Sequence, residues 1–255
     1  MMTRLEIVRD LRRLGVQRGD VLLVHSSLSS MGMVDGGAET VIDALLEAVG
    51  VGSDGTLLMP SFQNGMEYEL ARRGCVFDVR TSVCELGIIP ESFRRRAGVA
   101  RSVNPTHCTA GTGRRAAELL AGHHLCHVSV GKGSPYDKLV QAGGKILLLG
   151  VTHKSNTTLH FVENTGGAPT VSRELFEPAA IDSEGTSWKV PMHPHLMGIK
   201  RNYERAEEEL LAAGIQRNGN VGTATARLID SGAMVTHLKR RLGENPCYLI
   251  DVFTP

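Results

Sequence analysis

The chain has 255 residues, which is enough for one large α/β domain, and we predict a single domain over residues 1–255. Its 28 basic and 27 acidic residues give a net charge of +1, so no overall field favours nucleic acid or an anionic membrane, and a small molecule is the expected partner. The five cysteines are scattered without a C-x-x-C pair, which argues against a disulfide framework or a zinc knuckle. No window approaches the ~20 apolar residues of a membrane span, and the charged N-terminus lacks an apolar signal region, so we expect a cytoplasmic protein.

Helical and strand patterns alternate along the first 150 residues. The elements predicted in chain order are a helix over 4–14, a strand over 21–24, a helix over 38–49, a strand over 56–59, helices over 88–96 and 114–120, and a strand over 145–150. The strands are short, apolar and rich in branched residues, as strands buried on both faces of a sheet are. Helices that alternate with such strands predict an α/β sheet with parallel pairs.

The pattern changes after residue 165. Residues 170–190 alternate polar and apolar side chains around turn signals, which predicts antiparallel strands. Residues 201–213 and 225–242 show helical periodicity again. We therefore predict a mixed, largely parallel central sheet flanked by helices, with a smaller antiparallel β segment toward the C-terminal half.

The first candidate site follows the strand at 21–24. The segment from His25 to Gly37 runs from the carboxyl end of this strand into the start of a helix, and ligands of open α/β sheets bind in that crevice. Free N–H groups at the helix start, with glycines that allow a close approach, make a generic site for a phosphate or pyrophosphate. The same glycines and serines also fit an ordinary turn.

The second candidate site is the segment from Asn156 to Glu163, a few residues after the strand at 145–150. Thr157 or Thr158 would cap a helix on which His160 and Glu163 share a face. A carboxylate that accepts a hydrogen bond from one ring nitrogen fixes the tautomer and leaves the other nitrogen free as a base. The alternative is a solvated surface pair, which this spacing also produces.

Two further segments carry polar side chains. The proline-marked loop over 101–111 contains His107, which either acts as a catalytic group or orders the loop. Residues 131–139 form a loop and a helix start, with Ser134 as N-cap and Pro135 in the first turn. Its glycines and Lys132 would also fit a ligand channel.

The remaining histidines raise the question of a metal. His123, His127, His193 and His195 lie in two short clusters that could share an ion. No His-Glu-x-x-His or paired-cysteine motif accompanies them, so we predict no metal and keep a metal-dependent hydrolase as an alternative.

Taken together, the motifs resemble those of the aminoglycoside 3-N-acetyltransferase family. They are His25-Ser-Ser-Leu28, Gly32-x-Val34-x-Gly36-Gly37, Gly87-Ile-Ile-Pro-Glu91-x-Phe-Arg, Arg101-Ser102-x-Asn-Pro, Ser134-Pro-x-x-x-Leu and Asn156-Thr-x-Leu-His-x-x-Glu163, with a weaker echo at Gly219-Asn-Val-Gly222 before a predicted helix. The order of several motifs is far more specific than any one of them.

The resemblance implies that acetyl-coenzyme A (acetyl-CoA) lies near the segment from His25 to Gly37, and that His160 is the general base, supported by Glu163. The residues expected to bind acetyl-CoA are His25, Ser26, Ser27, Leu28, Gly32, Val34, Gly36, Gly37, Arg101 and Ser102. An aminoglycoside is polycationic, so carboxylates should line its site. The expected substrate-binding residues are Glu67, Asp78, His107 and Asn156.

Three points stay open in the sequence. Residues 63–84 lack the tryptophan that the family shows after the second strand, and residues 192–197 match no motif, so the acceptor could be another small amine. Cys108 would need an activating base that its neighbour His107 does not readily supply, so we expect direct transfer and an active Cys108→Ala variant. A homodimer and a monomer both fit the composition.

Overall fold

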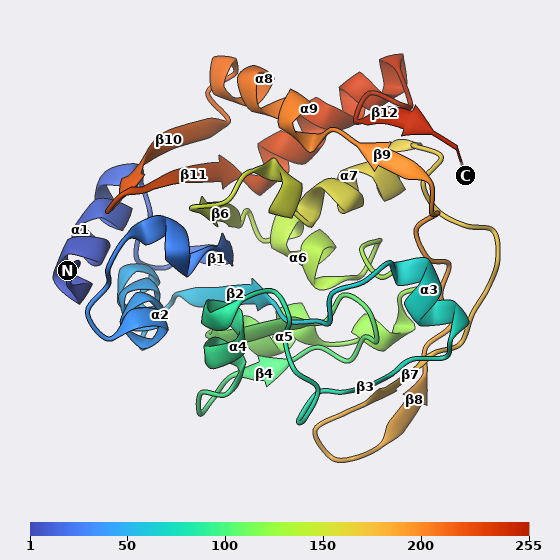
Figure 1. Cartoon of the computed structure of the whole chain (residues 1–255), viewed down its shortest axis with the longest axis horizontal. Helices are drawn as coiled ribbons and strands as arrows, with labels where there is room; N and C mark the ends of the chain where they lie inside the picture. Colours follow the sequence, from blue (N-terminus) through green and yellow to red (C-terminus); the bar gives the residue numbers. More distant parts are fainter. Residues whose placement is uncertain (255) are drawn as a thin grey trace.

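The computed structural model describes residues 1–254 and contains a central sheet of seven strands in the order β10-β11-β6-β1-β2-β5-β4 (Figure 1). The strands of this sheet are β1 (Val21–Ser26), β2 (Thr56–Pro60), β4 (Ala100–Arg101), β5 (Thr109–Gly113), β6 (Lys145–Leu149), β10 (Gln216–Val221) and β11 (Ala224–Asp230). The central strand β1 pairs parallel with both β2 and β6, and the outer strands pair antiparallel. The predicted mixed α/β sheet is confirmed, and its parallel part is the central triplet β6-β1-β2.

Helices cover both faces of the sheet. They are α1 (Arg4–Leu14), α2 (Gly37–Val49), α3 (Glu67–Arg72), α4 (Ile88–Arg94), α5 (Ala116–Leu120), α6 (Pro135–Gln141), α7 (Thr158–Gly166), α8 (Ala206–Ala212) and α9 (Ser231–Glu244), with single turns η1 (Leu28–Met31), η2 (His123–Leu125), η3 (His153–Ser155) and η4 (Tyr203–Arg205). Side chains of β1 alternate between two apolar clusters. Leu22 and Val24 pack with α1, α2 and α4, whereas Val21 and Leu23 pack with α5, α6, α7 and α9. This alternation explains why the strand reads as a continuous apolar run.

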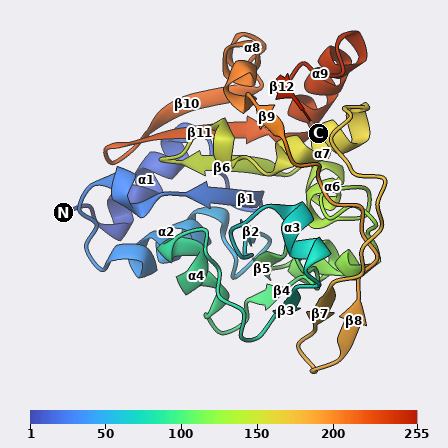
Figure 2. The same ribbon diagram turned by 45° about the vertical axis from the view of Figure 1, so that its right-hand side comes forward.

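Two small sheets complete the fold. Strands β3 (Val76–Asp78), β7 (Ala179–Ile181) and β8 (Ser187–Lys189) form one, and the antiparallel pair of β7 with β8 confirms the β segment predicted after residue 165. Strands β9 (Ile199–Arg201) and β12 (Ile250–Phe253) form the other, beside α7. Figure 2 shows the β3-β7-β8 sheet at the opposite end of the molecule from α8.

The helix predicted over 225–242 is wrong in its first part. Residues 224–230 form β11, which pairs with β6 on one side and with β10 on the other. The segment after Gly222 is therefore a hairpin strand, and helix α9 begins at Ser231, where Asp230 accepts a hydrogen bond from the amide of Ala233. Tertiary pairing overrides the helical propensity of this alanine- and arginine-containing stretch. The helix predicted from Arg201 likewise begins later, at Ala206.

No helix within residues 1–254 has both the length and the apolar character that crossing a membrane requires.

Candidate active site

Three adjoining cavities lie at the carboxyl ends of the parallel strands. The central cavity has a volume of about 400 Å³ and is lined by His25, Ser26, Leu86, His107, Thr157 and His160, among others. The serine-side cavity, which includes Ser27, Leu28 and Gly32, shares Ser26 and Leu86 with it. The histidine-side cavity, of about 230 Å³, includes Glu67, His195 and Arg201 and shares Gly65, His107 and His160 with it. The strand ends thus form one continuous groove with two histidines between its halves.

His160 lies in the first turn of α7. The side chain of Asn156 accepts a hydrogen bond from the backbone N–H of Thr158 at 3.2 Å, so Asn156 orders the start of this helix, whereas the predicted caps Thr157 and Thr158 make no capping bond. The His160 side chain is 21% exposed, toward the two cavities that it lines.

One ring nitrogen of His160 faces a buried polar group. The hydroxyl of Tyr203 donates to Oε2 of Glu163 at 2.8 Å, and its oxygen lies 2.9 Å from Nδ1 of His160. Because the single phenolic proton goes to Glu163, the phenolic oxygen accepts from Nδ1–H of His160. Nε2 then carries the lone pair, and no group within residues 1–254 bonds to it. The structure brings together the pair of His160 and Glu163 that the sequence predicts, with Nδ1 of His160 3.4 Å from Oε2 of Glu163.

The carboxylate of Glu163 is fully buried and ionised. Arg201 donates to it from Nε at 2.9 Å. Burial raises the pKa of Glu163, but His160 and Arg201 more than offset this and hold it below its usual value. Burial, followed by the neighbouring His195, lowers the pKa of His160 to about 3, so the imidazole is neutral at neutral pH. Burial and the charge of Glu163 raise the pKa of Tyr203 well above its usual value, so the phenol keeps its proton.

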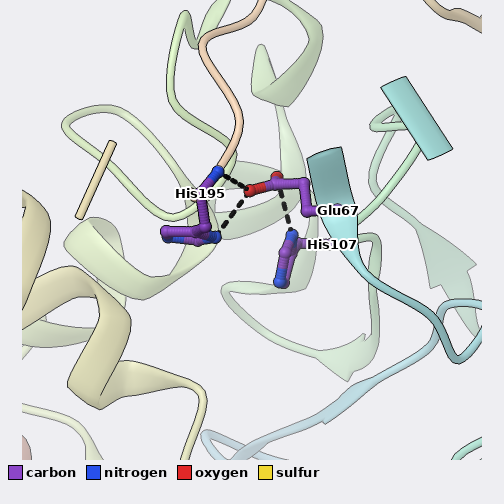
Figure 3. Close-up of side chains that lie close together, drawn as sticks. All are labelled: Glu67, His107 and His195. Atoms are coloured by element: carbon purple, nitrogen blue, oxygen red, sulfur yellow. Dashed lines mark hydrogen bonds and ion pairs between the residues drawn. The ribbon is translucent and has the colours of Figure 1, made fainter. Parts of the chain in front are cut away.

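A second carboxylate, Glu67, binds two other histidines (Figure 3). Its Oε1 accepts from the hydroxyl of Thr106 at 2.8 Å and lies 3.0 Å from Nδ1 of His107. Its Oε2 accepts from the backbone N–H of His195 at 2.8 Å and lies 2.5 Å from the ring Nδ1 of the same residue. Burial raises the pKa of Glu67, yet His195 and His107 hold it well below its usual value. The rings of His107, His160 and His195 lie within 6.1 Å of one another, measured between centroids.

Glu67, His107 and His195 also have the spacing of a metal site, because one ligand atom from each lies within 4.8 Å of the others. The amide nitrogen of Asn164 donates to the carbonyl of Val130 at 3.0 Å, which fixes the orientation of this amide, and it also donates to Nε2 of His195 at 3.0 Å. Nδ1 of His195 therefore carries a proton, and its hydrogen bond to Glu67 uses the position that a metal would need. The absence of a metal stays a prediction.

The four histidines of the alternative metal site are not brought together in one ligand group. His123 is bound between the hydroxyl of Ser102 and the carbonyl of Ser129, at 2.8 and 2.7 Å. Nδ1 of His193 lies 3.0 Å from the carbonyl of Glu174, and His195 belongs to the Glu67 group. This arrangement gives no support to the hydrolase alternative.

The residues predicted to bind acetyl-CoA divide into two sets. Those that line the central or serine-side cavity are His25, Ser26, Ser27, Leu28 and Gly32. Val34, Gly36 and Gly37 lie where the chain turns into α2 and do not line the three cavities. Arg101 donates to the carbonyls of Val79, Ser82 and Ser61, and Ser102 bonds to His123, so both are occupied by internal hydrogen bonds.

The residues predicted to bind the acceptor also divide. Glu67 and His107 line the histidine-side cavity. Asp78 lies in β3, where it pairs with Arg80 at 2.7 Å, and does not line the three cavities. Asn156 is buried and serves the start of α7. Cys108 is fully buried, its thiol bonds to the carbonyl of Ser102 at 3.0 Å, and burial raises its pKa, all of which suit a structural cysteine.

Three residues of the site are not predicted from the sequence: Tyr203, Arg201 and Asn164. Arg201 ends β9 and Tyr203 begins the turn η4 two residues later, in a segment that the sequence pattern predicts as helical. A polar Arg-x-Tyr pattern carries no signal for a particular partner, because only the docking of β9 beside α7 brings it to Glu163. Asn164 is adjacent to Glu163 in sequence but serves His195 instead.

The comparisons with known proteins point to one family. The family model for aminoglycoside 3-N-acetyltransferase matches residues 23–243. The chain is 31% identical to aminoglycoside N(3)-acetyltransferase III of Acinetobacter baumannii, over 96% of this chain and 94% of that protein. It is similar to the solved structure of AAC-IIIb, a binary complex with CoASH, with 31% identity and a TM-score of 0.79 over 94% of this chain and 97% of the other. It is also similar to AAC-VIa bound to sisomicin, with 29% identity and a TM-score of 0.80 over 95% and 97% of the two chains. Motifs, fold and relatives agree over most of the chain, which belongs to the aminoglycoside 3-N-acetyltransferase family of acyltransferases.

Proposed function

We propose that this protein transfers the acetyl group of acetyl-CoA directly to the 3-amino group of an aminoglycoside, with His160 as general base and Glu163 as its support. The observation that carries the proposal is the position of His160 in the wall shared by the central and histidine-side cavities. A base at this position can reach an amine from one cavity while the thioester occupies the other.

The central and serine-side cavities fit the donor. Nε2 of His25 and Oγ of Ser26 are buried without a hydrogen-bond partner, and both residues line the central cavity. Such orphaned groups are rare in folded proteins, and an acyl or amide oxygen of acetyl-CoA would supply the missing partner. The relative AAC-IIIb is a binary complex with CoASH, which supports a coenzyme A thioester as the donor.

The hydrogen bonds around His160 suit proton abstraction. Nδ1–H is fixed by the phenolic oxygen of Tyr203, so the lone pair on Nε2 is available to the substrate. As the amine nitrogen bonds to the thioester carbon, its remaining protons become acidic, and Nε2 accepts one of them. The imidazolium that forms is stabilised by the buried carboxylate of Glu163. The bond from carbon to sulfur then breaks, and the thiolate of CoA takes up a proton.

One observation favours a second candidate, an acceptor with fewer positive charges than an aminoglycoside. The charged residues that line the histidine-side cavity are Glu67 and Arg201, and each is already bonded within the protein. A polycation would find few unpaired carboxylates there. The relative bound to sisomicin supports the aminoglycoside, so it remains the first candidate.

The test is release of free thiol from acetyl-CoA over a panel of aminoglycosides and smaller amines. Wild type should acetylate at least one aminoglycoside, and His160→Ala should lose about 100-fold or more of kcat. His237→Ala is the matched control, because His237 also bonds to a glutamate, Glu209, at 3.0 Å but lines none of the three cavities. An active His160→Ala variant would refute the assignment of His160 as general base. Turnover of the small amines alone would show that the acceptor is a small amine and not an aminoglycoside.

A further inference from the structure

His107 faces the same junction as His160. Its ring lines both the central and the histidine-side cavity, and the centroids of the two rings are 6.1 Å apart. The His107 side chain is 11% exposed, and no group within residues 1–254 bonds to its Nε2. The groove therefore presents two imidazole nitrogens.

The proton positions around Glu67 follow from the hydrogen bonds. The amide of Asn164 makes His195 a neutral ring with its proton on Nδ1, which donates to Glu67. Glu67 receives two further donors, from Thr106 and from the backbone of His195, and is ionised. An ionised carboxylate only accepts, so the third ring contact, to Nδ1 of His107, is also donated by the ring. Nε2 of His107 then holds a lone pair.

The reaction releases two protons from the acceptor nitrogen. An ammonium group must lose one proton before it can attack, and the resulting amine loses a second as the amide forms. One of these protons ends on the sulfur of CoA and the other in solvent. A single base would have to release the first proton before it could take the second.

We infer that His107, held by Glu67, takes the first proton from the substrate ammonium, so that His160 is free to take the second. This inference rests on the proposed function. Nε2 of His107 accepts H⁺ from R–NH₃⁺, which leaves R–NH₂. The nitrogen then bonds to the thioester carbon, Nε2 of His160 accepts the second proton, and the carbon–sulfur bond breaks. The thiolate recovers the proton of His160, and His107 releases its own proton to solvent.

The charges around His107 suit this role. Glu67 on α3 is the carboxylate in contact with the ring, with Oε1 3.0 Å from Nδ1 of His107. The rings of His160 on α7 and of His195, in the segment between β8 and β9, lie 6.1 and 5.6 Å from it, measured between centroids. Arg201 lines the histidine-side cavity but is paired with Glu163, and Lys154 lines the central cavity. Of the two imidazoles that contact Glu67, His107 is thus the one whose Nε2 has no partner within residues 1–254, because Nε2 of His195 accepts from Asn164.

The experiment is the pH dependence of kcat/KM for an aminoglycoside that wild type acetylates, measured with His107→Gln from pH 6 to pH 9.5. If His107 removes the ammonium proton, the variant should be slower by about 100-fold at the acid end. The deficit should shrink to less than about tenfold at the alkaline end, where solvent removes that proton. Glu67→Gln, which weakens the base without removing it, should show a smaller deficit of the same shape.

The matched control is Glu69→Gln, because Glu69 lies on the same helix but pairs with Arg72. Its profile should follow wild type. A His107→Gln deficit that stays constant across the pH range would show a structural role and overturn the inference, as would full activity at pH 6. Either result leaves the proposed function standing, because that function is tested separately by thiol release with wild type and His160→Ala.

Discussion

The phenolic oxygen of Tyr203 lies 2.9 Å from Nδ1 of His160, although the two residues are 43 positions apart in sequence. Its hydroxyl donates to Glu163 at 2.8 Å, a shorter contact than the 3.4 Å between His160 and Glu163 themselves. The phenol is therefore the main link between the imidazole and the carboxylate, and it sets which ring nitrogen is left without a partner beside the two cavities.

Removal of the Tyr203 hydroxyl should slow catalysis without loss of the fold. In Tyr203→Phe the ring still fills its buried site, but Nδ1 of His160 loses its acceptor, and the other tautomer becomes accessible. We expect kcat to fall about 10- to 100-fold with little change in KM. Tyr248→Phe is the control, since that hydroxyl bonds to Glu209 instead. Equal activity of the two variants would contradict the role of Tyr203.

Neutralisation of Glu163 should destabilise the protein through Arg201. The carboxylate of Glu163 is fully buried and the Arg201 side chain is 17% exposed, so Glu163→Gln leaves a guanidinium without its partner. We expect a loss of about 3 kcal/mol in the free energy of unfolding, measured with urea. The double variant Glu163→Gln/Arg201→Met should recover part of the lost stability. If its loss equals the sum of the losses in the two single variants, the explanation through Arg201 is wrong.

Acid should unfold the protein through its buried histidines. Burial lowers the pKa of His25, His123 and His160 to about 3 in the folded chain, from an ordinary value of 6.5. Between these values only the unfolded chain binds the protons, so stability is lost as pH falls below about 6.5, by about 1.4 kcal/mol per pH unit for each histidine.

Urea unfolding at pH 7, 6 and 5 measures this slope. His123→Asn should reduce it by about 1.4 kcal/mol per pH unit, since one of the titrating groups is removed. A free energy of unfolding that does not change between pH 7 and pH 5 would contradict the neutral state assigned to these rings.

A larger side chain at Leu86 should block the donor side of the groove. Leu86 is half-buried and lines both the central and the serine-side cavity. Leu86→Trp should raise KM for acetyl-CoA by about tenfold, which corresponds to about 1.4 kcal/mol of binding, and leave KM for the acceptor nearly unchanged. Val83→Trp, on the same loop but outside the three cavities, should behave as wild type. A rise in the acceptor KM alone would reverse the assignment of the cavities.

The thiol of Cys108 should be dispensable. It is fully buried and does not line the three cavities, so Cys108→Ala should keep most of the activity in the thiol-release assay. Loss of turnover in a variant that still binds acetyl-CoA would point to an acyl-enzyme.

The sequence predicts the half of the site that follows parallel strands. His25 and Ser26 end β1, and the segment with His160 follows β6, so neighbouring strands in one sheet bring them together at the same edge. The pair of His160 and Glu163 is also local, because three residues on a helix place both on one face.

The other half depends on contacts that no local pattern encodes. Tyr203 and Arg201 reach Glu163 because β9 docks beside α7, and Glu67 meets His195 across 128 positions of sequence. The helix prediction at 225–230 is wrong for a related reason. The composition of this segment allows a helix, but it forms a strand because it pairs with the edge of β6, where Leu228 lies opposite Leu147.

Strand β9 ends at Arg201, and its partner in the small sheet is β12, where Ile250 pairs with Arg201. Beyond it, the amide of Asn202 donates to the carbonyl of Leu249 at 2.8 Å, and Arg205 pairs with Asp251 at 2.7 Å. The segment that carries Tyr203 is thus held on both sides by residues 249–251. An affinity tag or fusion partner that disturbs β12 would misplace the phenol. A lower catalytic rate would then indicate that this strand is displaced.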